Sequence, residues 1–187
     1  MNSGIIKNEE NMITVDVNDE NPENHWKYIN IKPGELAVDF GCGRWEKVEH
    51  RESSWLTTPE FLLSRGAKFV YAFDKDKEEI DWFNEKFMST TSMKFLQRDL
   101  SLPDAMLNII VDLEPDVVKC DIEKHEVNLL NFHRSVFRSV RMYAIETHKD
   151  WIFNAFMSEF PVRGYEVTAV INLTHAKPMK VIFAERK

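Results

Sequence analysis

Cysteine is scarce in this chain, and its arrangement carries no metal or redox motif. Among 187 residues there are two cysteines, Cys42 and Cys120. Neither belongs to a Cys-x-x-Cys motif or to a cluster of Cys and His. We therefore interpret both as reduced, buried small residues rather than as a disulfide framework or zinc ligands.

A net positive charge and long apolar runs are also lacking. The formal net charge of -7 argues against a nucleic-acid partner, because such binding depends largely on contacts between basic side chains and phosphates. No apolar run approaches the ~20 residues that cross a bilayer, and the first residues do not follow the pattern of a signal peptide. We expect a cytoplasmic protein with no membrane partner. The oligomeric state is not indicated.

What the chain does contain is typical of one folded domain. Hydrophobic residues make up 43% and aromatic residues 12% of the sequence, enough for a packed core. Residues 1–30 are rich in Asn and Glu and predict a flexible or partly docked N-terminal segment. Residues 31–187 are predicted to form the domain itself.

Short apolar runs alternate with helical patterns along this domain. One helix is predicted to begin with Thr58 as its N-cap and Pro59 in its first turn. Another, after Asp150, is expected to end before Pro161. The last two strands, joined across residues 175–178, predict an antiparallel hairpin at a sheet edge. The fold class is therefore α/β, with a doubly wound, Rossmann-like, mostly parallel sheet of seven strands. The predicted strands are 36–40, 68–73, 93–97, 116–120, 141–145, 165–173 and 179–184.

The first strand ends in a glycine loop. Leu36 to Phe40 are followed by Gly41, Cys42 and Gly43, and glycine lets a ligand approach the backbone closely. The third glycine of the dinucleotide fingerprint is missing, since Glu46 takes its place, so a pyrophosphate fits poorly. A nucleotide-dependent oxidoreductase is accordingly disfavoured.

Polar side chains follow the strand ends, where ligands of parallel sheets bind. An adenosine without phosphates fits the loop, because Asp74 after the second strand could accept hydrogen bonds from both ribose hydroxyls. Asp39 and the glycine backbone could then accommodate a cationic tail. Alternatively, Asp74 interacts with the dipole of the following helix. The residues at this edge are Asp39, Asp74, Asp99, Asp121, Glu123, Glu146 and His148.

The residues from Asp39 to Gly43, together with Asp74, resemble the opening of class I S-adenosylmethionine-dependent methyltransferases. The segment from Lys119 to Glu126 is similar to the Lys-x-Asp-x-Glu-Gly-x-Glu segment of FkbM-type methyltransferases, with Lys124 at the place of its glycine. Residues 144–148 resemble the next strand end of that family, and Gly164 its final turn.

This resemblance implies an enzyme that binds S-adenosylmethionine and methylates a hydroxyl of a small molecule or glycan. An alternative is a methyltransferase-like binding module without turnover, favoured by Trp45 and Lys124. The loop from Arg44 to Thr57, longer than the family's, is a candidate lid. The predicted cofactor-binding residues are Asp39, Gly41, Cys42, Gly43, Asp74, Lys75 and Asp99.

His148 is the preferred general base because its ordinary pKa lies near neutrality. It could equally be bonded to Glu146. Lys119 lies two residues from Asp121 and could pair with it, and Asp99 could contact the adenine or cap the turn at Ser101. The predicted catalytic residues are His148, Asp121, Glu123 and Lys119.

These strand-end residues could alternatively bind a metal ion. Asp121, Glu123, Glu146 and His148 are suitable ligand types if they converge. The spacing does not show that they do, so no metal is predicted.

Overall fold

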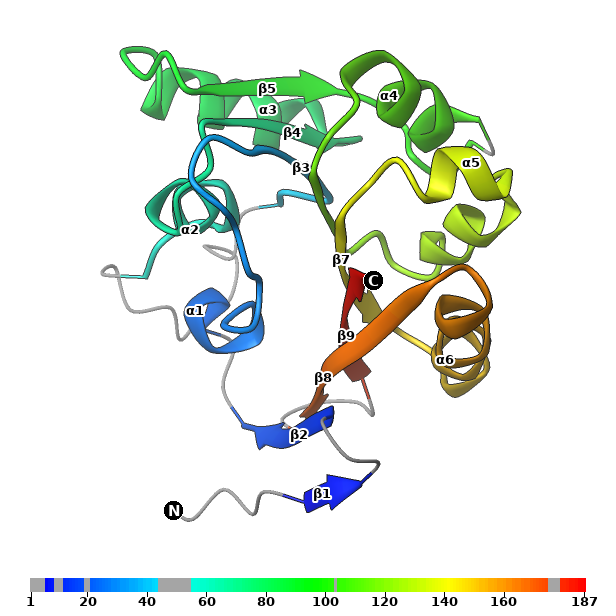
Figure 1. The fold of residues 1–187 in the computed structure, drawn as a ribbon. Coiled ribbons are helices and arrows are strands. Elements are labelled where there is room, and N and C mark those ends of the chain that lie inside the picture. Colours follow the sequence, from blue (N-terminus) through cyan, green and yellow to red (C-terminus); the bar gives the residue numbers. More distant parts are fainter. Residues whose placement is uncertain (1–5, 9–11, 19–20, 44–54, 103, 175–178) are drawn as a thin grey trace.

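The computed structural model describes residues 6–8, 12–18, 21–43, 55–102, 104–174 and 179–187 (Figure 1). Trp45 and most of the predicted 44–57 loop lie outside these residues. The strands are β1 (Ile6–Asn8), β2 (Met12–Val17), β3 (Leu36–Phe40), β4 (Phe69–Asp74), β5 (Met93–Gln97), β6 (Val117–Cys120), β7 (Met142–Thr147), β8 (Tyr165–Leu173) and β9 (Met179–Arg186). The helices are α1 (Pro22–His25), α2 (Thr58–Ser64), α3 (Lys77–Lys86), α4 (Ala105–Leu113), the 3-10 helix η2 (Glu126–Asn131), α5 (Arg134–Phe137) and α6 (Asp150–Val162).

One sheet runs through the domain, in the order β1-β2-β8-β9-β7-β6-β3-β4-β5. Strands β3 to β7 pair in parallel, and β9 lies antiparallel between β7 and β8. The predicted Rossmann-like fold is confirmed. All residues of β6 and β7 are buried, as expected for central parallel strands covered on both faces.

The sheet is wider than predicted, with nine strands among the described residues rather than seven. β2 pairs in parallel with β8, with Val15 opposite Ile171, so the C-terminal hairpin does not form a sheet edge. Trp26 and Ile29, which follow α1, are fully buried. Part of the predicted N-terminal segment, residues 1–30, therefore belongs to the same sheet and core.

Helices cover both faces of the sheet, with α1 and α2 on one side and α4, α5 and α6 on the other (Figure 1). Phe61 and Leu62 of α2 share a core cluster with Trp26. The other face buries a larger cluster that includes residues of α4 and α6. Among the described residues, no helix combines the length and apolarity needed to cross a membrane.

Two helix ends differ from the prediction by a short distance. The N-cap of α2 is Thr57 rather than Thr58, because the Thr57 backbone N–H and hydroxyl both donate to Glu60 Oε2, at 2.8 and 2.7 Å. Helix α6 begins at Asp150 and continues through Pro161 to Val162. Proline so close to a C-terminus costs few helical hydrogen bonds.

Candidate functional site

The glycine loop begins with a turn that only glycine fits. Gly41 has φ +81°, and its N–H donates to Phe73 O of the neighbouring strand at 2.9 Å. A Cβ at Gly41 would lie 1.8 Å from Asp121 O. The backbones that leave β3 and β6 therefore touch at this point, whereas the sequence predicted the close approach of a ligand.

Beside this turn lies a buried ion pair. Asp39 and Lys119 are direct cross-strand partners on β3 and β6, and Lys119 Nζ lies 2.9 Å from Asp39 Oδ1. The ammonium also donates to Gly41 O at 2.7 Å and lies 5.0 Å from the ring centroid of Trp26. The predicted partner Asp121 is more distant, at 3.9 Å.

This burial changes the roles predicted for both residues. The side chains of Lys119 and Asp39 are 2% and 0% exposed, so neither reaches a ligand at the sheet edge. Burial lowers the pKa of Lys119, but the charges of Asp39 and Asp121 outweigh it and raise the pKa above its ordinary value. Lys119 is a charged, buried residue that donates to the Gly41 carbonyl, and this burial argues against its predicted catalytic role.

A cavity of ≈ 270 Å³ opens at the carboxyl ends of β3, β4, β5 and β6. Of the predicted cofactor-binding residues, four line it: Gly41, Asp74, Lys75 and Asp99. Cys42 is buried away from it, with 1% exposure. A Cβ at Gly43 would lie 3.5 Å from Asp74 Oδ2, so Gly43 and the Asp74 carboxylate are neighbours. The other lining residues are Arg98, Leu100, Ser101, Asp121, Ile122, Glu123 and His125.

The two acids after β4 and β5 have different local roles. Asp74 Oδ1 accepts a hydrogen bond from the Asp76 N–H at 3.0 Å, and Asp76, not Asp74, caps α3. Asp99 Oδ1 accepts from both the hydroxyl and the N–H of Ser101, at 2.6 and 3.0 Å. These bonds hold the pKa of Asp99 below its ordinary value. Asp99 therefore caps the turn at Ser101, which is the second of the two roles predicted for it, and also lines the cavity.

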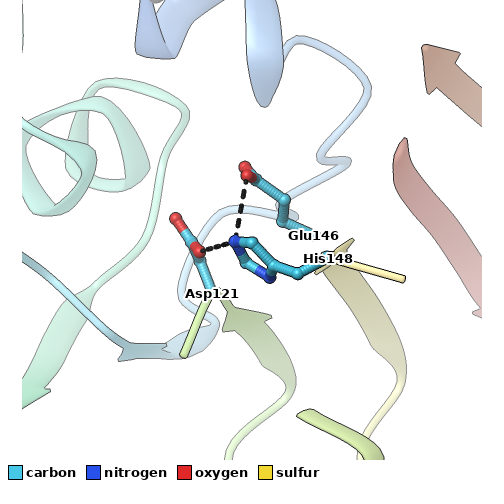
Figure 2. Close-up of side chains that lie close together, drawn as sticks. All are labelled: Asp121, Glu146 and His148. Carbon is cyan, nitrogen blue, oxygen red and sulfur yellow. Dashed lines mark ion pairs between the residues drawn. The ribbon is translucent and has the colours of Figure 1, made fainter. Parts of the chain in front are cut away.

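A second cluster lies next to the cavity, at the carboxyl ends of β6 and β7 (Figure 2). His148 Nε2 is 3.5 Å from Asp121 Oδ1 and 3.5 Å from Glu146 Oε1. Glu123, whose side chain is 78% exposed, lies 3.9 Å from the same nitrogen. The sequence predicted all four residues at one edge, and the structure brings them together.

Glu126 completes this cluster and was not singled out from the sequence. Its Oε1 accepts from the His148 backbone N–H at 3.1 Å and lies 3.2 Å from His148 Nδ1. Glu126 is fully buried at the start of η2. In the sequence, Glu126 could have been identified by its position as the last acid of the Lys119–Glu126 segment.

The carboxylates change the chemistry of His148. Burial lowers the pKa of His148, but the hydrogen bond to Glu126 and the charges of Asp121 and Glu146 raise it to about 9. Without a further ligand, the imidazole is protonated at neutral pH and has no lone pair to accept a proton. This argues against the preferred choice of His148 as general base.

The turn between these clusters is strained. Glu123 and Lys124 have φ values of 53° and 84°, a conformation that costs a residue with a Cβ roughly 1–2 kcal/mol. Lys124 stands where the FkbM segment has glycine, and the positive φ explains why glycine suits that place.

Replacing Lys124 with glycine should therefore raise the free energy of unfolding by about 1 kcal/mol, because the strain is relieved. Chemical denaturation measures the change. Lys124→Ala is the control, since it removes the same charge and keeps the Cβ. A Lys124→Gly protein no more stable than the Lys124→Ala protein would contradict this explanation.

Comparison with known proteins gives matches at the level of the fold. No protein-family model and no curated protein matches the chain. An uncharacterised protein from Listeria monocytogenes serotype 4b aligns with a TM-score of 0.62 and 10% identity, over 89% of this chain and 66% of its own. A putative tRNA (m1A22) methyltransferase from Streptococcus pneumoniae, in complex with S-adenosyl-L-methionine, aligns with a TM-score of 0.61 and 11% identity, over 88% and 71%.

The methyltransferase domain of METTL16 is similar in the same way, with a TM-score of 0.59 and 11% identity over 88% of this chain and 64% of its own. The likeness concerns the fold, an α/β Rossmann-like fold that the chain shares with solved methyltransferases. The chain spans about two thirds of the length of these three structures. The finer resemblance to FkbM-type enzymes stays a prediction.

Proposed function

We propose that this protein is an S-adenosylmethionine-dependent methyltransferase that acts on a hydroxyl of a small molecule or glycan. The proposal depends on one observation: the Gly41 turn and Asp74 line the same cavity, at the carboxyl ends of parallel strands. A structure with the same fold has been solved in complex with S-adenosyl-L-methionine.

The residues at the cavity fit that cofactor. The close contact of Gly41 with Asp121 O leaves no room for a side chain, so the loop presents bare backbone. Asp74 uses Oδ1 for the Asp76 N–H, and within the described part of the chain its Oδ2 accepts no hydrogen bond. A carboxylate oxygen so placed suits a ribose hydroxyl pair. Asp39 is buried and takes no direct part.

The bound cofactor would supply an electrophilic sulfonium methyl group for transfer to the acceptor oxygen, with the neutral thioether as the leaving group. An alcohol must lose its proton in this process, and a nearby carboxylate can take it. Asp121 and Glu123 line the cavity, whereas His148 contacts Asp121 from the neighbouring strand. We assign proton removal to the two carboxylates and positioning to His148.

Charge favours a small acceptor over a nucleic acid. The chain carries a net charge of -7. The cavity wall includes four acids, Asp74, Asp99, Asp121 and Glu123, against the basic Lys75 and Arg98, so on balance it repels phosphates. Arg141, which directly precedes β7, forms ion pairs with Glu35 and Glu185, so its charge is already balanced by protein carboxylates. One solved neighbour is a putative tRNA methyltransferase, so an RNA acceptor belongs in the same assay as a control.

Asp74→Ala should weaken the binding of S-adenosylmethionine about 10- to 100-fold, because the lost hydrogen bonds to a charged group are worth about 1.5–3 kcal/mol. Isothermal titration calorimetry with S-adenosylmethionine and S-adenosylhomocysteine measures the change. Asp81→Ala is the matched control, since Asp81 is exposed on α3, where it pairs with Lys77. It removes the same charge away from the cavity.

Absence of cofactor binding to the wild-type protein at millimolar concentration would overturn the proposal. Equal losses in Asp74→Ala and Asp81→Ala would overturn the role of Asp74. Cofactor binding without methyl transfer to any of a broad panel of hydroxyl acceptors would support the binding module instead.

A further inference from the structure

We propose that Asp121, Glu146 and His148 form a binding site for a divalent metal ion. One ligand atom from each of the three lies within 4.8 Å of the other two, and Figure 2 shows both carboxylates turned toward His148 Nε2. The last pairs of β6 and β7 place Cys120 opposite Ile145, so Asp121 and Glu146 follow as neighbours. This site does not depend on the cofactor of the proposed function.

The orientation of His148 supports metal binding. Glu126 Oε1 lies 3.2 Å from Nδ1 and also accepts the His148 backbone N–H. A proton on Nδ1 then points at Glu126, and the lone pair of Nε2 points at Asp121 and Glu146. A carboxylate that holds the remote nitrogen of a histidine is the usual outer support of a metal ligand.

A buried, unpartnered oxygen points independently to a missing ligand. Glu146 is 3% exposed, and among the described residues its Oε2 has no hydrogen-bond partner. Burying a carboxylate without compensation is costly, so such a group needs an explanation. A cation between Glu146 and Asp121 would supply the missing interaction and relieve the repulsion between the two carboxylates.

The alternative is a protonated His148 that holds the carboxylates together without metal. The geometry favours the metal, because Nε2 lies 3.5 Å from each of the two oxygens. Hydrogen bonds from N–H to O have donor–acceptor distances of about 2.7–3.2 Å. A proton on Nε2 would therefore form a good hydrogen bond with neither carboxylate, whereas a metal ion can bind all three groups at once.

The donor set indicates the kind of ion. Carboxylate oxygens suit Mg²⁺, Ca²⁺ and Mn²⁺, and an imidazole nitrogen suits first-row transition metals. Mn²⁺ satisfies both preferences and is the probe of choice. Asp121 also lines the cavity, so the ion would lie at the end of the cavity. With Asp121 bound to the ion, proton removal from the acceptor would fall to Glu123, which is largely exposed and outside the ligand set.

The full chain, freed of metal with a chelator, is titrated with MnCl₂ alone, and the free ion is followed by electron paramagnetic resonance. We expect one Mn²⁺ per chain. Glu146→Gln and Glu126→Gln should each weaken binding by about 10- to 100-fold. Glu166→Gln is the matched control, because Glu166 pairs with Lys187 at the amino end of β8, the opposite end of the sheet from this cluster, and should change nothing. CaCl₂ should bind more weakly than MnCl₂, since Ca²⁺ takes oxygen ligands.

A second measurement needs no variant and remains valid where a substitution prevents folding. Electron spin echo spectra of the wild-type Mn²⁺ complex should contain the ¹⁴N coupling of a directly bound imidazole. The proposal is overturned by absence of binding at millimolar Mn²⁺, by a complex without nitrogen coupling, or by a folded Glu146→Gln protein that binds as the wild type does. None of these results depends on S-adenosylmethionine binding, so they separate this site from the proposed function.

Discussion

Replacing Lys119 with methionine is expected to lower the free energy of unfolding by about 3–5 kcal/mol, the usual cost of leaving one charge of a buried pair without its partner. Lys119 Nζ lies 2.9 Å from Asp39 Oδ1, and both side chains are almost completely buried. Methionine keeps the length and apolar stem of lysine. The loss therefore reports the uncompensated Asp39 carboxylate rather than a cavity. Urea denaturation measures it.

Two further variants test the cause of this loss. Lys77→Met makes the same substitution in an exposed pair with Asp81 and should cost less than about 1 kcal/mol. The double variant Asp39→Leu with Lys119→Met replaces both charges by apolar groups and should recover most of the loss, because a buried pair is rarely worth more than good apolar packing. A double variant as unstable as Lys119→Met alone would contradict the ion-pair explanation.

The central strands could be predicted because their signal is local. β3, β4, β6 and β7 are short, mainly apolar runs that stop at a glycine or an acidic residue, and such runs are typical of strands buried on both faces. β2 could not be predicted in this way. Its partner β8 lies more than 150 residues away in the chain, and its two buried residues, Val15 and Val17, alternate with polar ones in an acidic segment.

The cavity lining could be predicted for residues at or beyond a strand end, but not for Asp39, which lies within β3. Asp74, Asp99, Asp121 and Glu123 stand at or beyond their strand ends, and all line the cavity. Asp39 lies one residue before the end of β3, and its cross-strand partner Lys119 lies at the same level of β6.

The residue that covers Lys119 is Trp26, which belongs to the segment predicted to be flexible or partly docked. The sequence therefore assigned a catalytic role to a lysine whose burial depends on a distant part of the chain. Glu126 was missed for a related reason, since it becomes a partner of His148 only when η2 folds back to the end of β7.

Replacing Gly41 with alanine is expected to have an effect as large as the loss of Lys119, and to act on the cofactor loop itself. The added Cβ would lie 1.8 Å from Asp121 O, a distance at which one of the two backbones must move. The positive φ of Gly41 adds roughly 1–2 kcal/mol of strain. We expect a loss of at least about 3 kcal/mol, or a protein that does not fold, since overpacking and backbone strain add.

Gly34→Ala separates these two causes. Gly34 also has a positive φ, of 94°, but a Cβ there meets nothing within 4 Å, so only the strain of about 1–2 kcal/mol applies. Gly43→Ala gives the opposite comparison, because its Cβ would make an ordinary contact with Asp74 Oδ2 at 3.5 Å and the protein should fold. Equal losses in Gly41→Ala and Gly34→Ala, measured by denaturation, would mean that β3 and β6 do not touch at Gly41. If only Gly41→Ala is severe, glycine is required there by the fold itself, before any ligand enters the cavity.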